Sequence, residues 1–169
     1  MFVTFENRDP RELAGQPAFL RGYALRRLGD DRTTTVALWS ASSDPMAYRA
    51  EHDQLGTASD QPPGAAMVAW FDGPQSAARV TAARFANEHR IVPALARQPG
   101  VVRMIALWRE RDAAAGAVIL ATDLAALREA GTAINATELL PGEDPALLTG
   151  PDRVDIHDVV SVATEGISR

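Results

Sequence analysis

The chain has 169 residues, which is enough for one medium domain or two small ones. Its formal net charge of −5 argues against a nucleic-acid partner or an anionic membrane surface, because both require clustered Lys and Arg. Cysteine is absent, which excludes disulfides, thiol catalysis and Cys-ligated metals and is compatible with a reducing cytosol.

The first part of the chain alternates short strands with turns. The predicted elements are a strand, a short helix, two strands joined by a turn at 29–32, and a second helix (residues 1–6, 9–16, 20–28, 33–40 and 44–54). Asp9-Pro10 and Asp44-Pro45 place an N-cap residue before a proline that suits the first helical position, so each predicts a helix start. The segment 56–64 (GTASDQPPG) is small and polar with paired prolines, which indicates a linker.

The second part contains the longest helix. Its predicted elements are a strand, a helix, two strands joined by an Ala-rich turn at 112–116, a helix and a last strand after a long loop (residues 65–71, 75–97, 101–109, 117–122, 123–136 and 153–163). Pro93 lies inside the helical pattern, so we expect a kink or an early end there. The final residues are expected to fray.

The most informative pattern is an internal repeat with a period of about 82 residues. Segments 16–40 and 98–122 align without a gap, and identical residues are Gln16/Gln98, Pro17/Pro99, Arg21/Arg103, Ala24/Ala106, Leu25/Leu107, Arg27/Arg109, Asp30/Asp112, Val36/Val118 and Leu38/Leu120. The second copy is predicted as βαββαβ, the ferredoxin-like plan, whereas the first copy lacks most of its first helix and a clear fourth strand. We therefore expect an α+β fold with two tandem ferredoxin-like units, a shortened one at 1–56 and a complete one at 65–169, joined by a linker at 57–64 and packed sheet to sheet.

This pattern resembles the antibiotic-biosynthesis-monooxygenase superfamily, the dimeric α/β-barrel proteins. The residues that carry the resemblance are Gln16–Leu20 leading into a strand, Val36–Ser40, Val92–Leu95 and Gln98–Gly100. The resemblance implies two ferredoxin-like units that form one barrel, with a pocket between the helices and the sheet of each unit. It also implies oxygenases of aromatic polyketides, quinol-forming enzymes and haem degraders, besides members without known activity.

One finer similarity concerns haem. The opening FENR resembles the first strand of the haem-degrading branch, in which an Asn at the position of Asn7 acts with a Trp and a His. Carried over, the Trp position falls near Tyr48 and the His position near Ala58, with His52 about one helical turn earlier. The missing histidine argues against haem, and we expect no cofactor.

The predicted helix 75–97 carries the candidate catalytic residues. Arg84 and Glu88 fall within its apolar stripe and are four residues apart, so they are predicted to pair, either lining a pocket or as a structural ion pair. His89 lies at the border of the same face, where it is either a general base for a phenolic substrate or a partly exposed helical histidine.

Other candidates are aromatic or imidazole side chains. Tyr48 and His52 share a face of the predicted helix 44–54, either as a site for a hydroxyaromatic ligand or as an amphipathic surface. His157 on the last strand is expected to face solvent or an interface, and the scattered histidines predict no metal site. The tryptophans at strand ends are predicted either to line a ligand pocket or to pack the interface of the two sheets (Trp39, Trp70 and Trp108).

Two functions remain open from the sequence. The first is a monooxygenase-like enzyme that acts without metal or flavin on an aromatic or polyketide-like substrate, and the resemblance favours it. The second is a non-catalytic small-ligand-binding or assembly protein, which the shortened first copy favours. The first residues lack the order of a signal peptide and no apolar run is long enough to span a membrane, so we expect a cytoplasmic protein, either a monomeric pseudo-dimer or a homodimer.

Overall fold

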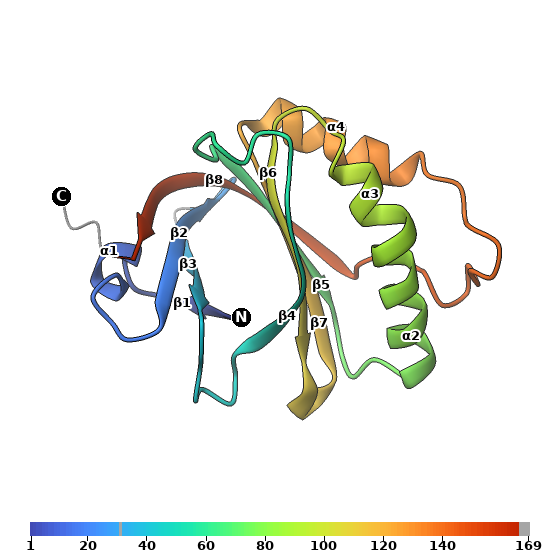
Figure 1. Ribbon diagram of the computed structural model, residues 1–169, viewed down its shortest axis with the longest axis horizontal. Coiled ribbons are helices and arrows are strands. Elements are labelled where there is room, and N and C mark those ends of the chain that lie inside the picture. The colour runs from blue at the N-terminus through green and yellow to red at the C-terminus, as the bar shows by residue number, and fades with distance from the viewer. Residues whose placement is uncertain (31, 166–169) are drawn as a thin grey trace.

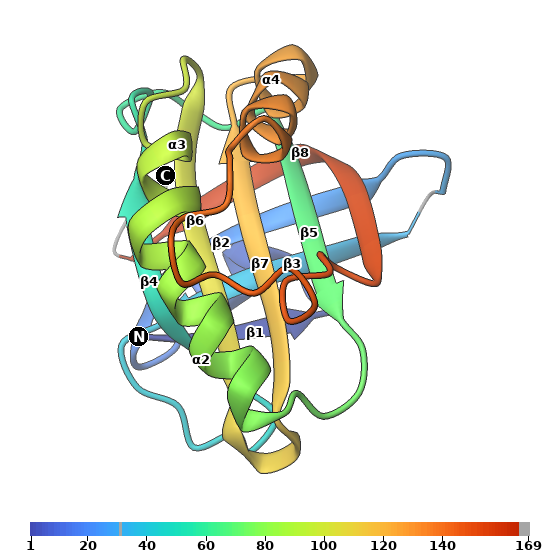
Figure 2. The same cartoon turned by 90° about the vertical axis from the view of Figure 1, so that its right-hand side faces the viewer.

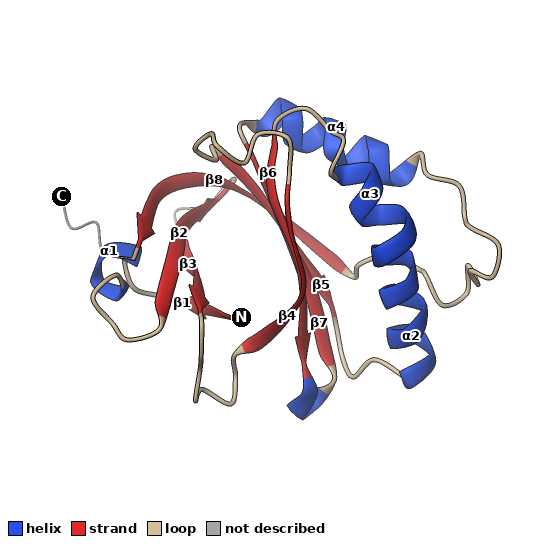
Figure 3. Cartoon of the chain, viewed as in Figure 1, coloured by secondary structure: helices blue, strands red, loops and turns tan. Residues whose placement is uncertain are grey.

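The computed structural model describes residues 1–30 and 32–165, and within them the strands form a closed antiparallel barrel with helices on its outside (Figures 1 and 3). Asp31 of the expected turn at 29–32 and the expected frayed end at 166–169 lie outside the described residues. The strands follow one another around the barrel in the order β1 (Phe2–Glu6), β3 (Thr33–Trp39), β2 (Phe19–Arg27), β8 (Arg153–Thr164), β5 (Ala65–Phe71), β7 (Ala114–Ala121), β6 (Val101–Arg109) and β4 (Tyr48–Leu55). The pairing of β4 with β1 closes the ring.

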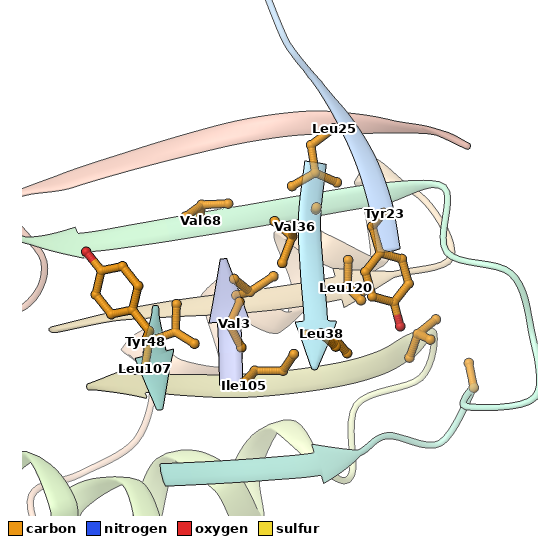
Figure 4. Close-up of a cluster of buried hydrophobic side chains, with 14 residues drawn as sticks. Val3, Tyr23, Leu25, Val36, Leu38, Tyr48, Val68, Ile105, Leu107 and Leu120 are labelled. Atoms are coloured by element: carbon orange, nitrogen blue, oxygen red, sulfur yellow. The ribbon is translucent and has the colours of Figure 1, made fainter. Parts of the chain in front are cut away.

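Successive side chains of a strand point to opposite faces of the sheet, so every second residue of a strand points into the barrel. Apolar residues at these positions fill the interior. On β3, for example, Val36 and Leu38 are fully buried inside the barrel. Inward residues from every strand except β8, together with Ala58 from the segment between β4 and β5, form one apolar cluster (Val3, Tyr23, Leu25, Val36, Leu38, Tyr48, Ala58, Ala66, Val68, Val102, Ile105, Leu107, Val118 and Leu120). Figure 4 shows that Tyr23 and Tyr48 lie at opposite ends of this cluster.

The longer helices cover one side of the barrel (Figure 2). They are α2 (Ala77–Ala86) and α4 (Leu124–Asn135), and the four-residue α3 (Val92–Leu95) lies on the same side, while α1 (Pro10–Leu13), also of four residues, lies on the other side. Asp9, Ser76 and Asp123 cap α1, α2 and α4 by accepting hydrogen bonds from backbone N–H groups. A second apolar cluster fills the space between α3, α4 and the sheet (Ala65, Leu95, Val101, Met104, Ile119, Ala121, Ala126, Leu127 and Ala130). None of the described helices is long and apolar enough to cross a membrane.

The expected helix at 75–97 is present but is not a regular α-helix throughout. A π-helical turn, η1 (Asn87–Ile91), separates α2 from α3, and Pro93 sits in the first turn of α3. Proline has no N–H for the hydrogen bond to the preceding turn, and its ring would clash with the carbonyl four residues earlier. The wider π turn accommodates the proline, so the irregularity precedes Pro93.

The expected helix at 44–54 is wrong. Asp44 makes only a turn, in which its side chain accepts from the backbone N–H of Met46, and residues 48–55 form strand β4. Tyr48 pairs with Val3 of β1, and Ala50 pairs with Leu107 of β6. The edges of β1 and β6 need a strand partner, and this tertiary demand overrides the local helix signal.

A smaller expectation also differs from the structure. The Ala-rich stretch 112–116 is not the turn, because a 3-10 turn at η2 (Glu110–Asp112) and a left-handed Ala113 (φ 52°) let β7 begin at Ala114. The segment predicted as a linker connects β4 to β5, and it packs on the barrel: Ala58 is buried in the barrel cluster and its N–H donates to the carbonyl of Val101.

The two repeated segments have the same local structure. Hairpins β2–β3 and β6–β7 each have a first strand of nine residues, with irregular pairing between Phe19 and Arg21 in one and between Val101 and Arg103 in the other. The strand orders also match, because β4-β1-β3-β2 and β8-β5-β7-β6 are adjacent halves of the ring, joined by the β2–β8 and β4–β6 pairs.

Candidate functional site

A cleft of about 370 Å³ lies at one end of the barrel, and we call it the mouth cleft. Its walls come from the starts of β4 and β8, the end of β5 with the loop after it, and the β6–β7 hairpin at the bottom of Figure 1. The lining residues are Tyr48, Trp70, Phe71, Asp72, Gly73, Pro74, Arg109, Asp112, Ala114, Ala115 and Arg153. Its volume falls within the range that small-molecule ligands occupy in proteins.

Three aromatic rings from three strands meet at this end of the barrel. The ring centroids of Phe5 and Trp70 are 4.7 Å apart, and the Tyr48 ring lies 5.9 Å from Phe5 and 6.0 Å from Trp70. Burial raises the pKa of the Tyr48 phenol above its usual range, and the nearby Arg109 guanidinium only partly opposes this shift. Tyr48 therefore stays a neutral hydroxyl that donates or accepts a hydrogen bond.

Two arginines that line the cleft lie over two of these rings. The guanidinium of Arg109 lies 4.4 Å from the centroid of Tyr48, and that of Arg153 lies 5.5 Å from the centroid of Trp70. Both distances are within the range of a cation–π interaction. The arrangement suits a planar ligand with negative charge, because it supplies apolar ring faces beside positive groups.

Each arginine has its own carboxylate. Arg109 donates from Nε and Nη2 to Asp112 at 2.8 Å, and these hydrogen bonds hold the pKa of the Asp112 carboxyl below its usual range. Arg153 donates from Nη1 to Oδ2 of Asp155 at 2.6 Å, and the other oxygen of Asp155 lies 2.6 Å from Nη2 of Arg27.

The predicted ligand-pocket residues do not all lie together. Tyr48 and Trp70 line the mouth cleft. Trp39 is buried on the outside of the barrel, where its Nε1 donates to the Thr4 hydroxyl, and Trp108 lies 6.0 Å from the Arg84 guanidinium. Asn7 borders a separate hollow of about 340 Å³.

His52 lies on β4, opposite Ala106 of β6, and not on a helix with Tyr48. The register of β4 shifts between Ala50 and His52, so the regular alternation that would relate His52 to Tyr48 is interrupted. The expected Tyr48–His52 pair on one helix face is therefore wrong.

The expected Arg84–Glu88 pair is also not formed. Arg84 donates instead to Glu51 of β4, with 3.0 Å between Nε and Oε2, while the Glu88 side chain is 64% exposed. His89 packs against Phe85 with 4.6 Å between ring centroids, and its Nε2 is 3.9 Å from the Glu88 carboxylate. Arg84, Glu88 and His89 thus lie on the solvent side of α2 and η1, away from the mouth cleft, and their catalytic role stays a prediction.

His157 is buried, so the expectation that it faces solvent is wrong. It is buried in the seam where β8 pairs with β2 and β5, and its Nδ1 has no hydrogen-bond partner within the described residues. Burial lowers the pKa of this imidazole, and the nearby Asp155 carboxylate partly opposes the shift.

Sequence reasoning missed several residues of this region, among them Phe5, Arg109, Asp112, Arg153 and Asp155. One available signal was the repeat itself, which aligns Arg27 with Arg109 at the ends of the two hairpins. Both arginines indeed reach a carboxylate at this end of the barrel. No pattern in the sequence points to Arg153 or Asp155. They reach this end of the barrel only because β8 pairs with both β2 and β5.

No protein-family model matches the chain, and no curated protein matches it in sequence. Solved structures do resemble it. A heme-degrading enzyme from Listeria monocytogenes has a TM-score of 0.57 at 10% identity, covering 94% of this chain and 97% of that chain. An anthrone oxidase-like protein has a TM-score of 0.58 at 10% identity, covering 99% and 95% respectively.

A third similar structure carries the family term in its name. It is an uncharacterized ferredoxin-fold protein related to antibiotic biosynthesis monooxygenases from Listeria monocytogenes, with a TM-score of 0.57, 9% identity, and 95% and 93% coverage of the two chains. At these identities the likeness establishes the fold alone. The chain therefore has the α+β barrel fold of monooxygenase-like ferredoxin-fold proteins.

Proposed function

We propose that this is a monooxygenase-like protein whose aromatic or polyketide-like substrate binds in the mouth cleft. The observation that carries the proposal is the stacking of Arg109 on Tyr48 and of Arg153 on Trp70 around one cleft. The names of the similar structures, which include an anthrone oxidase-like protein, support this class of chemistry.

The arrangement suits oxygenation of an acidic carbon or phenol. Guanidinium groups in a partly desolvated cleft stabilise the anionic form of a bound phenol or enol, and so favour its ionisation. An electron-rich anion of this kind reacts with O₂. When an activated methylene is oxidised, its two hydrogens are lost, one oxygen atom becomes the carbonyl, and the other leaves as water.

Haem fits the cleft poorly, so the proposal involves no haem. The lining residues include no histidine, cysteine or methionine, which are the usual axial ligands besides tyrosine. Tyr48 is the one phenol in the lining, and the Arg109 guanidinium covers its ring at 4.4 Å. We propose that the protein acts without metal, flavin or haem.

A second candidate function is ligand binding without catalysis. The specific observation in its favour is that Asp112 is tied to Arg109 and Asp155 to Arg153, so neither carboxylate is free to take a proton. The apolar cluster between α3, α4 and the sheet also fills the place where the family resemblance implies a pocket.

Oxygen consumption with dihydroxyanthrone as the probe separates the two functions. If the protein is an oxygenase, O₂ uptake and quinone absorbance rise above the rate without protein, and Tyr48→Phe or Arg109→Gln lowers the gain. The matched control is Trp39→Phe, which alters an aromatic ring outside the cleft. Binding without faster oxidation supports the second function, and absence of binding contradicts both.

We also propose that the barrel is an internal pseudo-dimer of two tandem units, 1–56 and 65–169, with 57–64 between them. The equal lengths of β2 and β6 and the matching strand orders support this. Every strand of the closed barrel already pairs with two other strands of the same chain, so a monomer is expected. Native mass spectrometry that finds an obligate dimer at low concentration would contradict the proposal.

A further inference from the structure

We infer that Arg153 determines the charge of the ligand in the mouth cleft, selecting an aromatic molecule with an anionic oxygen, and that Asp155 positions Arg153 for this role. The inference rests on the proposed binding of an aromatic ligand in the cleft. It adds which of the two arginines recognises the anion and what holds that arginine in place.

The two arginines of the cleft differ in how many of their donors are used. Arg109 donates from Nε and Nη2 to Asp112 and from Nη1 to the carbonyl of Met46. Arg153 donates only from Nη1, to Asp155, among the described residues. A guanidinium has five N–H groups, so Arg153 keeps both its Nε and its Nη2 side for a ligand.

The free side of Arg153 carries two parallel donors that can bind an anion. Nε and Nη2 form the fork that matches the two oxygens of a carboxylate, and they also bind a single phenolate oxygen. Arg153 lies over Trp70 and its side chain is half exposed at the cleft. A planar ligand in the cleft can therefore lie beside the guanidinium that covers Trp70, while its anionic oxygen meets this fork.

Asp155 is placed to orient Arg153 and not to bind the ligand itself. Its side chain is only 7% exposed, and it lies two residues from Arg153 on β8, so both side chains are on the inner face of the barrel wall. Arg27, from β2, reaches the other oxygen of Asp155. The carboxylate thus lies between two guanidiniums, of which only Arg153 hydrogen-bonds to it within the described residues, and this bond fixes Nη1 of Arg153 away from the ligand.

The groups that face Asp155 come from two strands. They are Arg27 on β2, and Arg153 and His157 on β8. Arg27 and Arg153 are half exposed, so water can solvate both guanidiniums when Asp155 is replaced. For this reason we expect variants at Asp155 to fold, and loss of orientation to be measurable separately from loss of structure.

Calorimetric titration with two matched ligand pairs tests the inference. Naphthoate and its neutral isostere naphthamide test for a carboxylate, and nitrophenolate and nitroanisole, at an alkaline pH at which the nitrophenol is ionised, test for a phenolate. The wild type should bind at least one anion roughly tenfold or more tightly than its neutral partner, the range for a hydrogen bond to a charged group. The pair with the larger ratio identifies the source of the negative charge.

Arg153→Gln should remove this preference, because it weakens binding of the anion far more than binding of the neutral partner. Arg26→Gln is the matched control. Arg26 on β2 pairs with Asp158 on β8, as Arg153 pairs with Asp155, but Arg26 does not line the cleft. If Arg153→Gln keeps the preference, or if the wild type binds each anion and its neutral partner equally, the inference is wrong and the proposed binding site stands. If none of the four probes binds, the proposed site and the inference both fail.

Asp155 is tested by the ratio of anion to neutral affinity, which a purely structural role would not change in a folded variant. Asp155→Ala should reduce the ratio, and Asp155→Asn should retain more of it because the amide oxygen still accepts from Nη1. Asp158→Ala is the control for loss of a carboxylate on β8. An unchanged ratio in both Asp155 variants would show that Arg153 needs no positioning residue.

Discussion

Ala18 and Gly100 occupy the same position in the two repeated segments and share a left-handed backbone. Each directly precedes the first strand of its hairpin, with φ of 67° at Ala18 and 76° at Gly100. Only glycine adopts this conformation without a steric penalty. The turn is therefore required by the fold at both places, and the first segment forms it with a strained alanine.

The surroundings of Gly100 predict a large loss of stability for Gly100→Ala. A Cβ there would lie 2.6 Å from the Cβ of Ala126 and 2.8 Å from the Thr122 hydroxyl, in addition to the left-handed strain. We expect the free energy of unfolding to fall by about 2 kcal/mol or more. Chemical denaturation measures this, and Gly131→Ala, in the open middle of α4, is the control that should gain about 0.5–1 kcal/mol.

The strain at Ala18 predicts the opposite effect for Ala18→Gly. Glycine removes the left-handed penalty but gives the unfolded chain more freedom, so we expect a gain between zero and about 1 kcal/mol. A clear loss of stability in the same denaturation experiment would show that the methyl group of Ala18 makes a contact that outweighs its strain.

Among the described residues, the most buried ion pair connects η1 to the long loop before β8. Arg90 donates to Glu143, with side-chain exposures of 11% and 1%, and also to the Thr137 hydroxyl. Removing Glu143 leaves the charge of Arg90 buried without its partner carboxylate. Glu143→Ala should therefore lower the free energy of unfolding by about 3–5 kcal/mol. Thermal and denaturant unfolding of Glu143→Ala and Glu88→Ala test this, since Glu88 is an exposed glutamate of the same turn.

Replacing Arg84 or Glu88, which do not pair with each other, should have small effects on the free energy of unfolding. Arg84 is half exposed and pairs with Glu51, so Arg84→Ala should cost no more than about 1 kcal/mol. Glu88→Ala should leave stability nearly unchanged, and the double variant should be additive because the two side chains do not pair. A double variant more stable than Arg84→Ala alone would show that Arg84 and Glu88 are coupled after all.

His157 predicts a pH dependence of stability. Burial lowers its pKa in the folded protein below the ordinary value of about 6.5 that the unfolded chain retains. As pH falls below that value, the unfolded state binds the proton first, so the free energy of unfolding decreases toward the folded-state pKa. Denaturation of the wild type and of His157→Leu between neutral and mildly acidic pH should show a shallower decrease in the variant, and equal slopes would contradict the prediction.

The regular part of the fold was readable because its signals are local. The strands at 65–71 and 101–109 have the predicted bounds, and Asp9-Pro10 starts a helix as expected. In each case a run of alternating or β-branched residues, or a capping residue before proline, acts within a few positions of the chain. The resemblance to monooxygenase-like barrels likewise came from such motifs, and the similar solved structures confirm that fold.

By itself the sequence determined the strand and turn pattern, most of the helices and the repeated hairpin, because propensity, capping and the alternation of apolar residues act locally. Only the tertiary structure decided that 48–55 is a strand, since the edges of β1 and β6 require a partner that no local pattern announces. The candidate site depends on the same closure. It places Tyr48, Trp70 and Arg153, which come from three distant strands, around one cleft, and that proximity arises from the ring of strand pairs rather than from any spacing along the chain.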